Sequence, residues 1–290
     1  MHPPVGTQLP YRSSRIYYYS WGSGPRLLFA FHGYGESAAS FAFLGAALDP
    51  SFTLVAIDLP FHGQTEWREG TVLYPEQLYS IMESIAGDLG RRSFSEGDIG
   101  RRSFSEGDPP LPWALLGYSM GGRIALQLFQ NHPDRFDRLV LMAPDGMTVN
   151  PWYWLATATT PGSLVFRWSM RHPGWLFLTL RCGHTLRLVN PSIYKFAVHY
   201  IDDRKVRQEL YTRWMAMRKF RPRLSRIAGL VRSRRTPVSL IYGKFDRIIR
   251  WERGEKFSGR CAGACQLLVV DAGHQLLRSQ YLPVILPLLG

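Results

Sequence analysis

A serine flanked by glycines lies near the middle of the chain, in the pentapeptide GYSMG at residues 117–121. An apolar run typical of a strand, Trp113 to Leu116, precedes it, and a run typical of a helix, Ile124 to Gln130, follows it. A strand that turns sharply into a helix at a serine holds the hydroxyl on an exposed apex, and the flanking glycines let the backbone pack closely. The pattern predicts a nucleophile elbow, with Ser119 as the nucleophile.

The acid and the base that such a serine requires follow it in the chain. A strand-like run, Val238 to Ile241, leads through a glycine turn to Asp246, and another, Leu267 to Val270, leads to His274. A serine hydroxyl needs an imidazole to take its proton and a carboxylate to hold that imidazole in the right tautomer. Asp246 is therefore the leading candidate acid and His274 the candidate base, while Asp145, which also follows a strand-like run, is the alternative acid.

A glycine-rich turn upstream supplies candidate donors for an oxyanion. Leu27 to Phe31 reads as a buried strand and runs into the tetrapeptide HGYG at residues 32–35. We expect the backbone N–H groups of Tyr34 and Met120 to point at the place where a carbonyl oxygen gains negative charge. Preset donors of this kind lower the barrier to acyl transfer by a few kcal/mol.

Five landmarks together resemble the α/β-hydrolase superfamily over nearly the whole chain. They are His32-Gly33, Asp58-Leu59-Pro60 with His62-Gly63, the elbow at 117–122, Asp246, and Ala272-Gly273-His274. The resemblance implies an α/β fold with a mostly parallel central sheet flanked by helices, an inserted helical cap, and a serine hydrolase mechanism. Phe61 stands where the family usually has a glycine, so we expect an altered turn there. Serine at the elbow argues against branches of the family whose nucleophile is aspartate.

The alternation of strand-like and helix-like runs predicts βαβ units. We expect a first part of the core at residues 1–146, a basic, aromatic-rich cap at 147–235, and the rest of the core at 236–290. The chain carries a net charge of +13, and residues 147–235 hold 17 Lys or Arg against 3 Asp or Glu. All of the excess positive charge therefore falls within the expected cap.

Three residues are candidates for binding substrate. The string at 117–126 resembles the menaquinone-pathway lyase subfamily, in which an arginine in this context binds a substrate carboxylate, and Arg123 matches it. An ordinary helical arginine paired with a neighbour is the alternative reading. Gly33 of the expected oxyanion turn and Trp154 among the cap aromatics are the other two candidates.

A small-molecule substrate is expected, and the basic cap indicates that it is anionic. Aromatic residues between arginines in the cap are also compatible with peripheral contact to a membrane. We expect no nucleic acid partner, because no recognised nucleic-acid module is present. The first 15 residues hold no continuous apolar stretch and the three cysteines form no CxxC pair, which favours a cytoplasmic protein without metal or other cofactor. The sequence does not specify an oligomeric state.

An identical octapeptide, RRSFSEGD, occurs at 91–98 and again at 101–108. It follows an expected helix at Pro75 to Leu89, and we interpret the duplication as a polar surface loop.

The sequence thus predicts a serine hydrolase that cleaves a carboxylic ester or thioester through an acyl-enzyme. Two alternatives stay open. One is a lyase or carbon–carbon hydrolase that uses the same three residues, and the other is a non-catalytic binding or membrane-associated homologue.

Overall fold

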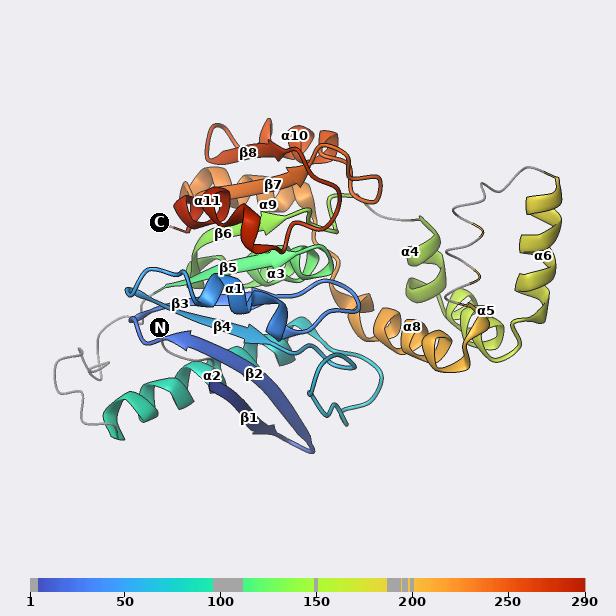
Figure 1. Cartoon of the computed structure of the whole chain (residues 1–290), viewed down its shortest axis with the longest axis horizontal. Coiled ribbons are helices and arrows are strands. Elements are labelled where there is room, and N and C mark those ends of the chain that lie inside the picture. Colours follow the sequence, from blue (N-terminus) through green and yellow to red (C-terminus); the bar gives the residue numbers. More distant parts are fainter. Residues whose placement is uncertain are drawn as a thin grey trace. The chain divides into compact units, whose positions relative to one another are not determined.

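The computed structural model describes residues 5–95, 112–148, 151–186, 194, 198 and 201–289, and its chain divides into two compact units (Figure 1). The first unit consists of Met1–Glu69, Tyr74–Thr148 and Phe220–Gly290, and the second of Gly70–Leu73 and Val149–Lys219. The second copy of the duplicated octapeptide and the end of the first lie outside the described residues.

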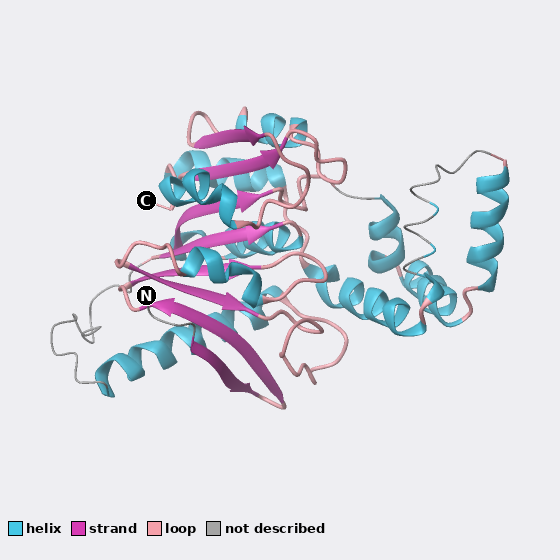
Figure 2. Ribbon diagram, in the orientation of Figure 1, coloured by secondary structure: helices cyan, strands magenta, loops and turns pink. Residues whose placement is uncertain are grey.

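A mostly parallel sheet of eight strands forms the first unit (Figure 2). Its strand order is β1-β2-β4-β3-β5-β6-β7-β8, with β1 and β2 antiparallel to their neighbours and the others parallel. The strands are β1 (Val5–Tyr11), β2 (Ser14–Gly22), β3 (Arg26–Phe31), β4 (Phe52–Ile57), β5 (Trp113–Tyr118), β6 (Phe136–Met142), β7 (Val238–Gly243) and β8 (Cys265–Val270). Each strand-like run expected from the sequence is a strand. Every residue of β4, β5 and β7 is buried, as expected for a parallel sheet covered on both faces.

Helices and 3₁₀ turns cover both faces of this sheet (Figure 2). One face packs against the turn η1 (Ala38–Phe41), α1 (Ala42–Gly45) and the C-terminal segment with η4 (Ser279–Tyr281), α11 (Leu282–Ile285) and η5 (Leu286–Leu288). Longer helices with buried apolar sides lie on the other face: α2 (Pro75–Ser95), α3 (Met120–Asn131) and α9 (Leu224–Arg234). The short element η2 (Pro133–Arg135) lies between α3 and β6, and α10 (Glu252–Ser258) lies between β7 and β8. This two-sided burial fixes the strand ends that carry the candidate site.

The second unit is helical. Its elements are α4 (Pro151–Ala158), α5 (Thr160–Arg171), α6 (Gly174–Thr185), α8 (Arg204–Ala216) and the turn η3 (Met217–Lys219). Thr159 caps α5 by accepting a hydrogen bond from the N–H of Gly162 at 3.0 Å. Aromatic rings join the helices, with Phe166 and Trp214 at a centroid distance of 5.5 Å. Basic residues in the C-terminal part of the expected cap lie on two helices, α8 and α9.

The structure corrects the C-terminal boundary of the expected cap, Arg235. Residues 220–235 belong to the first unit, because α9 packs on α3 through buried Ile227, Ala228 and Val231. The excess charge is divided accordingly. Residues 149–219 hold 11 Lys or Arg against 3 Asp or Glu, whereas residues 220–235 add 6 Arg and no acidic residue to the core unit.

Two local expectations also need correction. Helix α2 extends to Ser95, so the first five residues of the duplicated octapeptide continue a helix and are not a loop. Strand β1 was not expected from the sequence, since it lies at the edge of the sheet and only its Thr7 and Tyr11 are buried. Among the described residues, no helix is long and apolar enough to cross a membrane.

Candidate functional site

Ser119 sits at a sharp, strained turn between β5 and α3. Its backbone adopts φ 50° and ψ −115°, a combination that costs a non-glycine residue of the order of 1–3 kcal/mol. Tertiary hydrogen bonds hold it there: the N–H of Ser119 donates to the carbonyl of Met142 at 2.9 Å, and its carbonyl accepts from the N–H of Asp145 at 2.8 Å. The serine is therefore fixed by the loop after β6 as well as by its own strand and helix.

Glycines in the elbow allow this close packing. A Cβ atom on Gly121 would lie 1.9 Å from the carbonyl oxygen of Phe31, and one on Gly117 would lie 2.6 Å from that of Gly121. Such distances leave no room for a side chain, so the elbow is pressed against β3 and its following turn. This contact is why the motif demands glycine at these positions.

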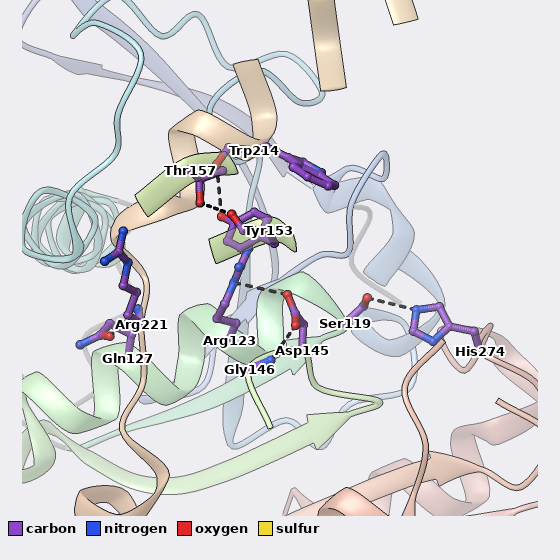
Figure 3. Close-up of polar contacts among 10 residues, drawn as sticks. All are labelled: Ser119, Arg123, Gln127, Asp145, Gly146, Tyr153, Thr157, Trp214, Arg221 and His274. Carbon is purple, nitrogen blue, oxygen red and sulfur yellow. Dashed lines mark hydrogen bonds and ion pairs between the residues drawn. The ribbon is translucent and has the colours of Figure 1, made fainter. Parts of the chain in front are cut away.

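His274 lies between Ser119 and Asp246. Its Nε2 is 3.1 Å from the hydroxyl oxygen of Ser119 (Figure 3), and its Nδ1 is 2.7 Å from Oδ2 of Asp246. With the proton on Nδ1, the ring donates to the carboxylate and Nε2 accepts from the serine hydroxyl. The structure thus brings together three predicted residues from the ends of β5, β7 and β8, in the geometry that general-base activation of a serine needs.

The carboxylate of Asp246 is held ionised. Its side chain is fully buried, and its other oxygen accepts hydrogen bonds from the N–H groups of Ile248 and Ile249 at 2.8 and 2.9 Å. Burial raises the pKa of Asp246, but hydrogen bonds from His274 and these two N–H groups outweigh it, so the pKa falls below its ordinary value. A carboxylate of this kind orients the imidazole and stabilises its protonated form.

Asp145, the alternative acid, is engaged elsewhere. Its Oδ2 is 3.4 Å from Nε of Arg123, and its Oδ1 accepts from the N–H of Gly146 at 2.7 Å (Figure 3). The side chain of Arg123 is only 10% exposed, because it lies in the first turn of α3 under the loop that follows β6. Arg123 therefore has a carboxylate partner within the protein, which is the alternative reading of this arginine.

Two buried side chains shape the expected oxyanion turn. His32 is fully buried: its Nδ1 is 2.8 Å from the carbonyl of Gly33, and its Nε2 accepts from the N–H of Leu59 at 3.1 Å. Asp58 accepts from the N–H of Ala38 at 2.7 Å and from that of Gln64 at the same distance. Together they join the turn after β3 to the loop after β4.

The two expected oxyanion donors come from the turn after β3 and from the start of α3. Tyr34 is half-buried in the turn after β3, with its ring edge against His62 at a centroid distance of 6.2 Å. Met120 is the first residue of α3, where backbone N–H groups have no partner within the helix. Their role as donors stays a prediction.

The turn that contains Phe61 keeps a backbone shape suited to glycine. Phe61 has φ 64°, in the left-handed region that side chains disfavour. The turn therefore keeps its shape, and the departure from glycine appears as backbone strain at Phe61. A hydrogen bond from the N–H of His62 to the carbonyl of Leu59, at 3.0 Å, spans this residue.

Neither of the other substrate-binding candidates is tested by this geometry. Gly33 packs between Tyr118 and Glu36, and Trp154 belongs to the second unit, where its side chain is exposed. A hollow of about 340 Å³ in the second unit, lined by Phe177, Leu178 and Arg181 among others, contains no predicted catalytic residue. Within the described residues, no group of three or more His, Cys, Asp or Glu side chains could hold a metal ion.

A family model described as serine aminopeptidase, S33, matches residues 24–278. The chain belongs to this α/β-hydrolase family. The S33 assignment agrees with the superfamily and the fold class that the sequence predicted, and it identifies a hydrolase-type protein.

Curated relatives of this S33 member match it weakly. The hydrolase YugF of Bacillus subtilis is 22% identical over 262 residues, which is 89% of this chain and 87% of that protein. The Mycobacterium tuberculosis protein Rv2715 is 32% identical over 127 residues, 44% of this chain. The chain spans only 31% of the length of Rv2715, one of the first curated relatives that it matches.

Solved structures share the fold of the S33 chain. A thioesterase domain from the curacin biosynthetic pathway has a TM-score of 0.59 at 15% identity and covers the whole of both chains. A malate-bound esterase from Thermogutta terrifontis has a TM-score of 0.61 at 19% identity over 97% of this chain and 94% of its own. A meta-cleavage product hydrolase from Pseudomonas fluorescens has a TM-score of 0.60 at 16% identity over 98% and 97%. At these identities the likeness shows the fold alone.

One residue beside the site was missed from the sequence. Glu36 follows the oxyanion turn, and its carboxylate lies against Gly33 on the side of Tyr118. A single acidic residue in a turn carries no periodic or motif signal, so only the folded structure reveals its neighbours.

Proposed function

We propose that this protein hydrolyses a carboxylic ester or thioester of a small molecule through an acyl-enzyme on Ser119. The observation that carries the proposal is the hydrogen-bonded chain from Ser119 through His274 to buried Asp246. Membership of the S33 family supports it, and esterases and thioesterases share the fold.

In the proposed reaction, Oγ of Ser119 attacks the acyl carbonyl while Nε2 of His274 takes the hydroxyl proton. The N–H groups of Tyr34 and Met120 receive the developing negative charge. His274 then gives its proton to the leaving oxygen or sulfur, and the acyl group stays on the serine. Water then attacks the acyl carbonyl while Nε2 of His274 takes one of its protons. As the acid leaves, His274 gives that proton to Oγ of Ser119, which restores the serine hydroxyl.

For the substrate we propose an apolar acyl part joined to an anionic group, with the second unit acting as the cap. Support comes from charge, because residues 149–219 carry 11 basic against 3 acidic residues. A field of this sign concentrates anions at low ionic strength. Arg123 is a weaker anchor for an anion than the sequence suggested, since Asp145 lies beside its guanidinium.

A panel of substrates tests the proposal. Neutral p-nitrophenyl esters of short and long chains and acyl-CoA thioesters would be offered to the wild type and to Ser119→Ala at low and high salt. We expect turnover by the wild type alone, with the thioesters losing more kcat/KM than the neutral esters as salt rises. Equal salt dependence for both classes would rule out the anionic preference but not the esterase activity.

A carbon–carbon hydrolase is the second candidate, because a meta-cleavage product hydrolase shares the fold. That reaction would use the same three residues on a carbon–carbon bond. A pre-steady-state burst of p-nitrophenol, followed by slow deacylation, would favour the esterase. Turnover of a meta-cleavage product without ester turnover would favour the alternative.

We further propose that the second unit contacts anionic membrane surfaces. Among the described residues, eight of the thirteen large apolar side chains with high exposure lie between residues 154 and 186, and Trp168 stacks on Trp175 with ring centroids 6.1 Å apart. Exposed arginines at 167, 171 and 181 alternate with them. Aromatic and aliphatic side chains beside arginine suit the boundary of an anionic bilayer.

Vesicle sedimentation tests this contact. We expect binding to phosphatidylglycerol vesicles and little binding to phosphatidylcholine vesicles. The double variant that combines Trp168→Ser with Leu178→Ser should lose binding to the phosphatidylglycerol vesicles. Phe245→Ser, which removes an equally exposed side chain from the core unit, serves as the matched control. Equal binding by all variants would contradict the proposal. Vesicle binding by a protein that never reacts with serine-directed reagents would favour the non-catalytic homologue.

A further inference from the structure

The side chain of Tyr118 connects the strand of the nucleophile to the loop of the candidate base. Tyr118 is the last residue of β5 and directly precedes Ser119. Its hydroxyl donates to the backbone carbonyl of His274 at 3.1 Å, and its ring lies 5.6 Å from the imidazole at an interplanar angle of 35°. One side chain therefore contacts the base through both its backbone and its ring.

The base itself lies in an open loop after β8. Gly273 and Gln275, the two neighbours of His274, are both exposed, and a Cβ atom on Gly273 would meet nothing within 4 Å. The carbonyl of His274 accepts a second hydrogen bond from the N–H of Leu276 at 2.9 Å, but that bond lies within the loop. The hydroxyl of Tyr118, by contrast, ties the same carbonyl to the central sheet.

Tyr118 is well suited to hold this carbonyl, because its own position is fixed. Its side chain is 1% exposed, and its backbone lies in β5 opposite Met142 of β6. A Cβ atom on Gly33 would lie 3.0 Å from Cε1 and 3.1 Å from Cδ1 of the ring, so the ring packs against the glycine of the expected oxyanion turn. A side chain at position 33 would push the ring, and with it the hydroxyl, out of place.

The phenol also remains a donor at neutral pH. Burial raises the pKa of Tyr118 well above its ordinary value, and the charges of Glu36 and Asp246 raise it further, while Arg278 lowers it only in part. The hydroxyl therefore keeps its proton, which it must have to bond to a carbonyl, since a carbonyl only accepts.

Tyr118 and Asp246 hold different parts of the same histidine. Asp246 contacts Nδ1 at 2.7 Å and sets the plane of the ring, whereas Tyr118 contacts the backbone from which the ring extends. The 3.1 Å between Nε2 and the hydroxyl oxygen of Ser119 depends on both restraints. A reacting group displaced by about 1 Å loses on the order of a hundredfold in rate, so the backbone restraint matters as well as the carboxylate.

We propose that Tyr118 is a positioning residue, which holds the backbone of His274 so that Nε2 stays within hydrogen-bond distance of the Ser119 hydroxyl. Tyr118 exchanges no proton in the reaction: the proton of Ser119 passes to Nε2 of His274 and from there to the leaving group. The proposal rests on the proposed hydrolase function, because this distance matters only if His274 takes that proton.

The kinetics of Tyr118→Phe test the proposal, since this variant keeps the ring and loses only the hydroxyl. With a fluorophosphonate, the rate constant for labelling of Ser119 should fall by about tenfold, while every molecule is still labelled at the end. With p-nitrophenyl acetate, kcat should fall by a similar factor. KM should change by less than about twofold, because the buried hydroxyl does not touch the substrate.

Tyr18→Phe is the matched control. The hydroxyl of Tyr18 is also buried, and it donates to Oδ2 of Asp88 in α2 at 3.0 Å. Both variants lose a buried hydrogen bond and should unfold at lower urea concentration than the wild type, but Tyr18→Phe should keep the wild-type labelling rate. If Tyr118→Phe were less stable yet matched the wild type in labelling rate and kcat, its hydroxyl would be merely structural and the proposal would be overturned.

Amide hydrogen exchange measures the restraint without catalysis. The N–H of Leu276 donates to the carbonyl that Tyr118 holds, so a looser loop should expose it. Its exchange should be about tenfold faster in Tyr118→Phe than in the wild type and unchanged in Tyr18→Phe. Equal exchange in the wild type and Tyr118→Phe would overturn the proposal. A wild type that shows the expected exchange but never reacts with the fluorophosphonate would instead count against the proposed hydrolase function, so the two failures are distinguishable.

Discussion

Nδ1 of His274 lies 2.7 Å from Oδ2 of Asp246, and no part of that aspartate side chain reaches solvent. Because the N–H groups of Ile248 and Ile249 hold the second oxygen, the carboxylate has one orientation, and it fixes the plane of the imidazole. Nε2 is thereby presented to Ser119 at 3.1 Å. The proposed chemistry depends on this contact, because it points Nε2 of His274 at the hydroxyl whose proton it must take.

Replacement of each candidate acid by asparagine should show whether Asp246 or Asp145 is the acid that serves His274. Asp246→Asn should lower kcat for p-nitrophenyl esters by about three to four orders of magnitude, because the imidazole loses the partner that sets its tautomer. Asp145→Asn should change kcat by less than about tenfold, since Asp145 contacts Arg123 and not His274. An equal loss of kcat in the two variants, or a larger loss in Asp145→Asn, would contradict the assignment of Asp246 as the acid and favour Asp145.

The depressed pKa of Asp246 predicts a pH-dependent contribution to stability. A carboxylate whose pKa is lower in the folded state stabilises the fold fully above its unfolded-state pKa of about 3.9, and that stabilisation disappears as pH falls through the folded-state value. The free energies of unfolding in urea of the wild type and Asp246→Asn should therefore differ most at neutral pH. Their difference should narrow below about pH 4, and a constant difference down to pH 3 would contradict the assignment.

The surroundings of two helical glycines, Gly121 at the elbow and Gly229 in α9, predict opposite effects of their substitution. Gly121→Ala should destabilise the protein by about 2–3 kcal/mol or prevent folding, because its Cβ would lie 1.9 Å from the backbone oxygen of Phe31. Gly229→Ala in α9 meets nothing within 4 Å and should raise the free energy of unfolding by about 0.5–1 kcal/mol. Urea denaturation measures both, and a tolerated Gly121→Ala would contradict the close contact between α3 and β3.

The ion pair of Arg123 and Asp145 predicts energetic coupling. A double-mutant cycle with Arg123→Met and Asp145→Asn should give a coupling energy of about 1–2 kcal/mol in urea denaturation, because the guanidinium is largely buried. If the cycle shows no coupling, and if the KM of Arg123→Met rises only for esters that carry a carboxylate, then Arg123 is the substrate anchor instead.

Sequence patterns predicted the parts of this fold that depend on continuous burial. Strand β5 and the elbow were predictable because every residue of the strand is buried and the glycines are forced by contact. Asp246 and His274 were predictable because each follows such a strand-like run. The edge strand β1, by contrast, is mostly exposed, so its composition resembles that of a loop.

Tertiary context decided the rest. Helix α9 carries an excess of basic residues, as the second unit does, and only its packing on α3 assigns it to the core. The choice between Asp246 and Asp145 was open because both follow strands, whereas the contact between Asp145 and Arg123 depends on how the loop after β6 lies over α3. Glu36 had no signal at all, since its place against Gly33 and beside Tyr118 appears only in the folded structure.

Fluorophosphonate labelling with mapping of the modified residue tests the central claim most directly. The intact mass of the wild type should rise by one adduct, peptide mapping should place the adduct on Ser119, and Ser119→Ala and heat-unfolded wild type should stay unmodified. An adduct on another residue, or a folded wild type that does not react, would contradict the assignment of Ser119 as an activated nucleophile.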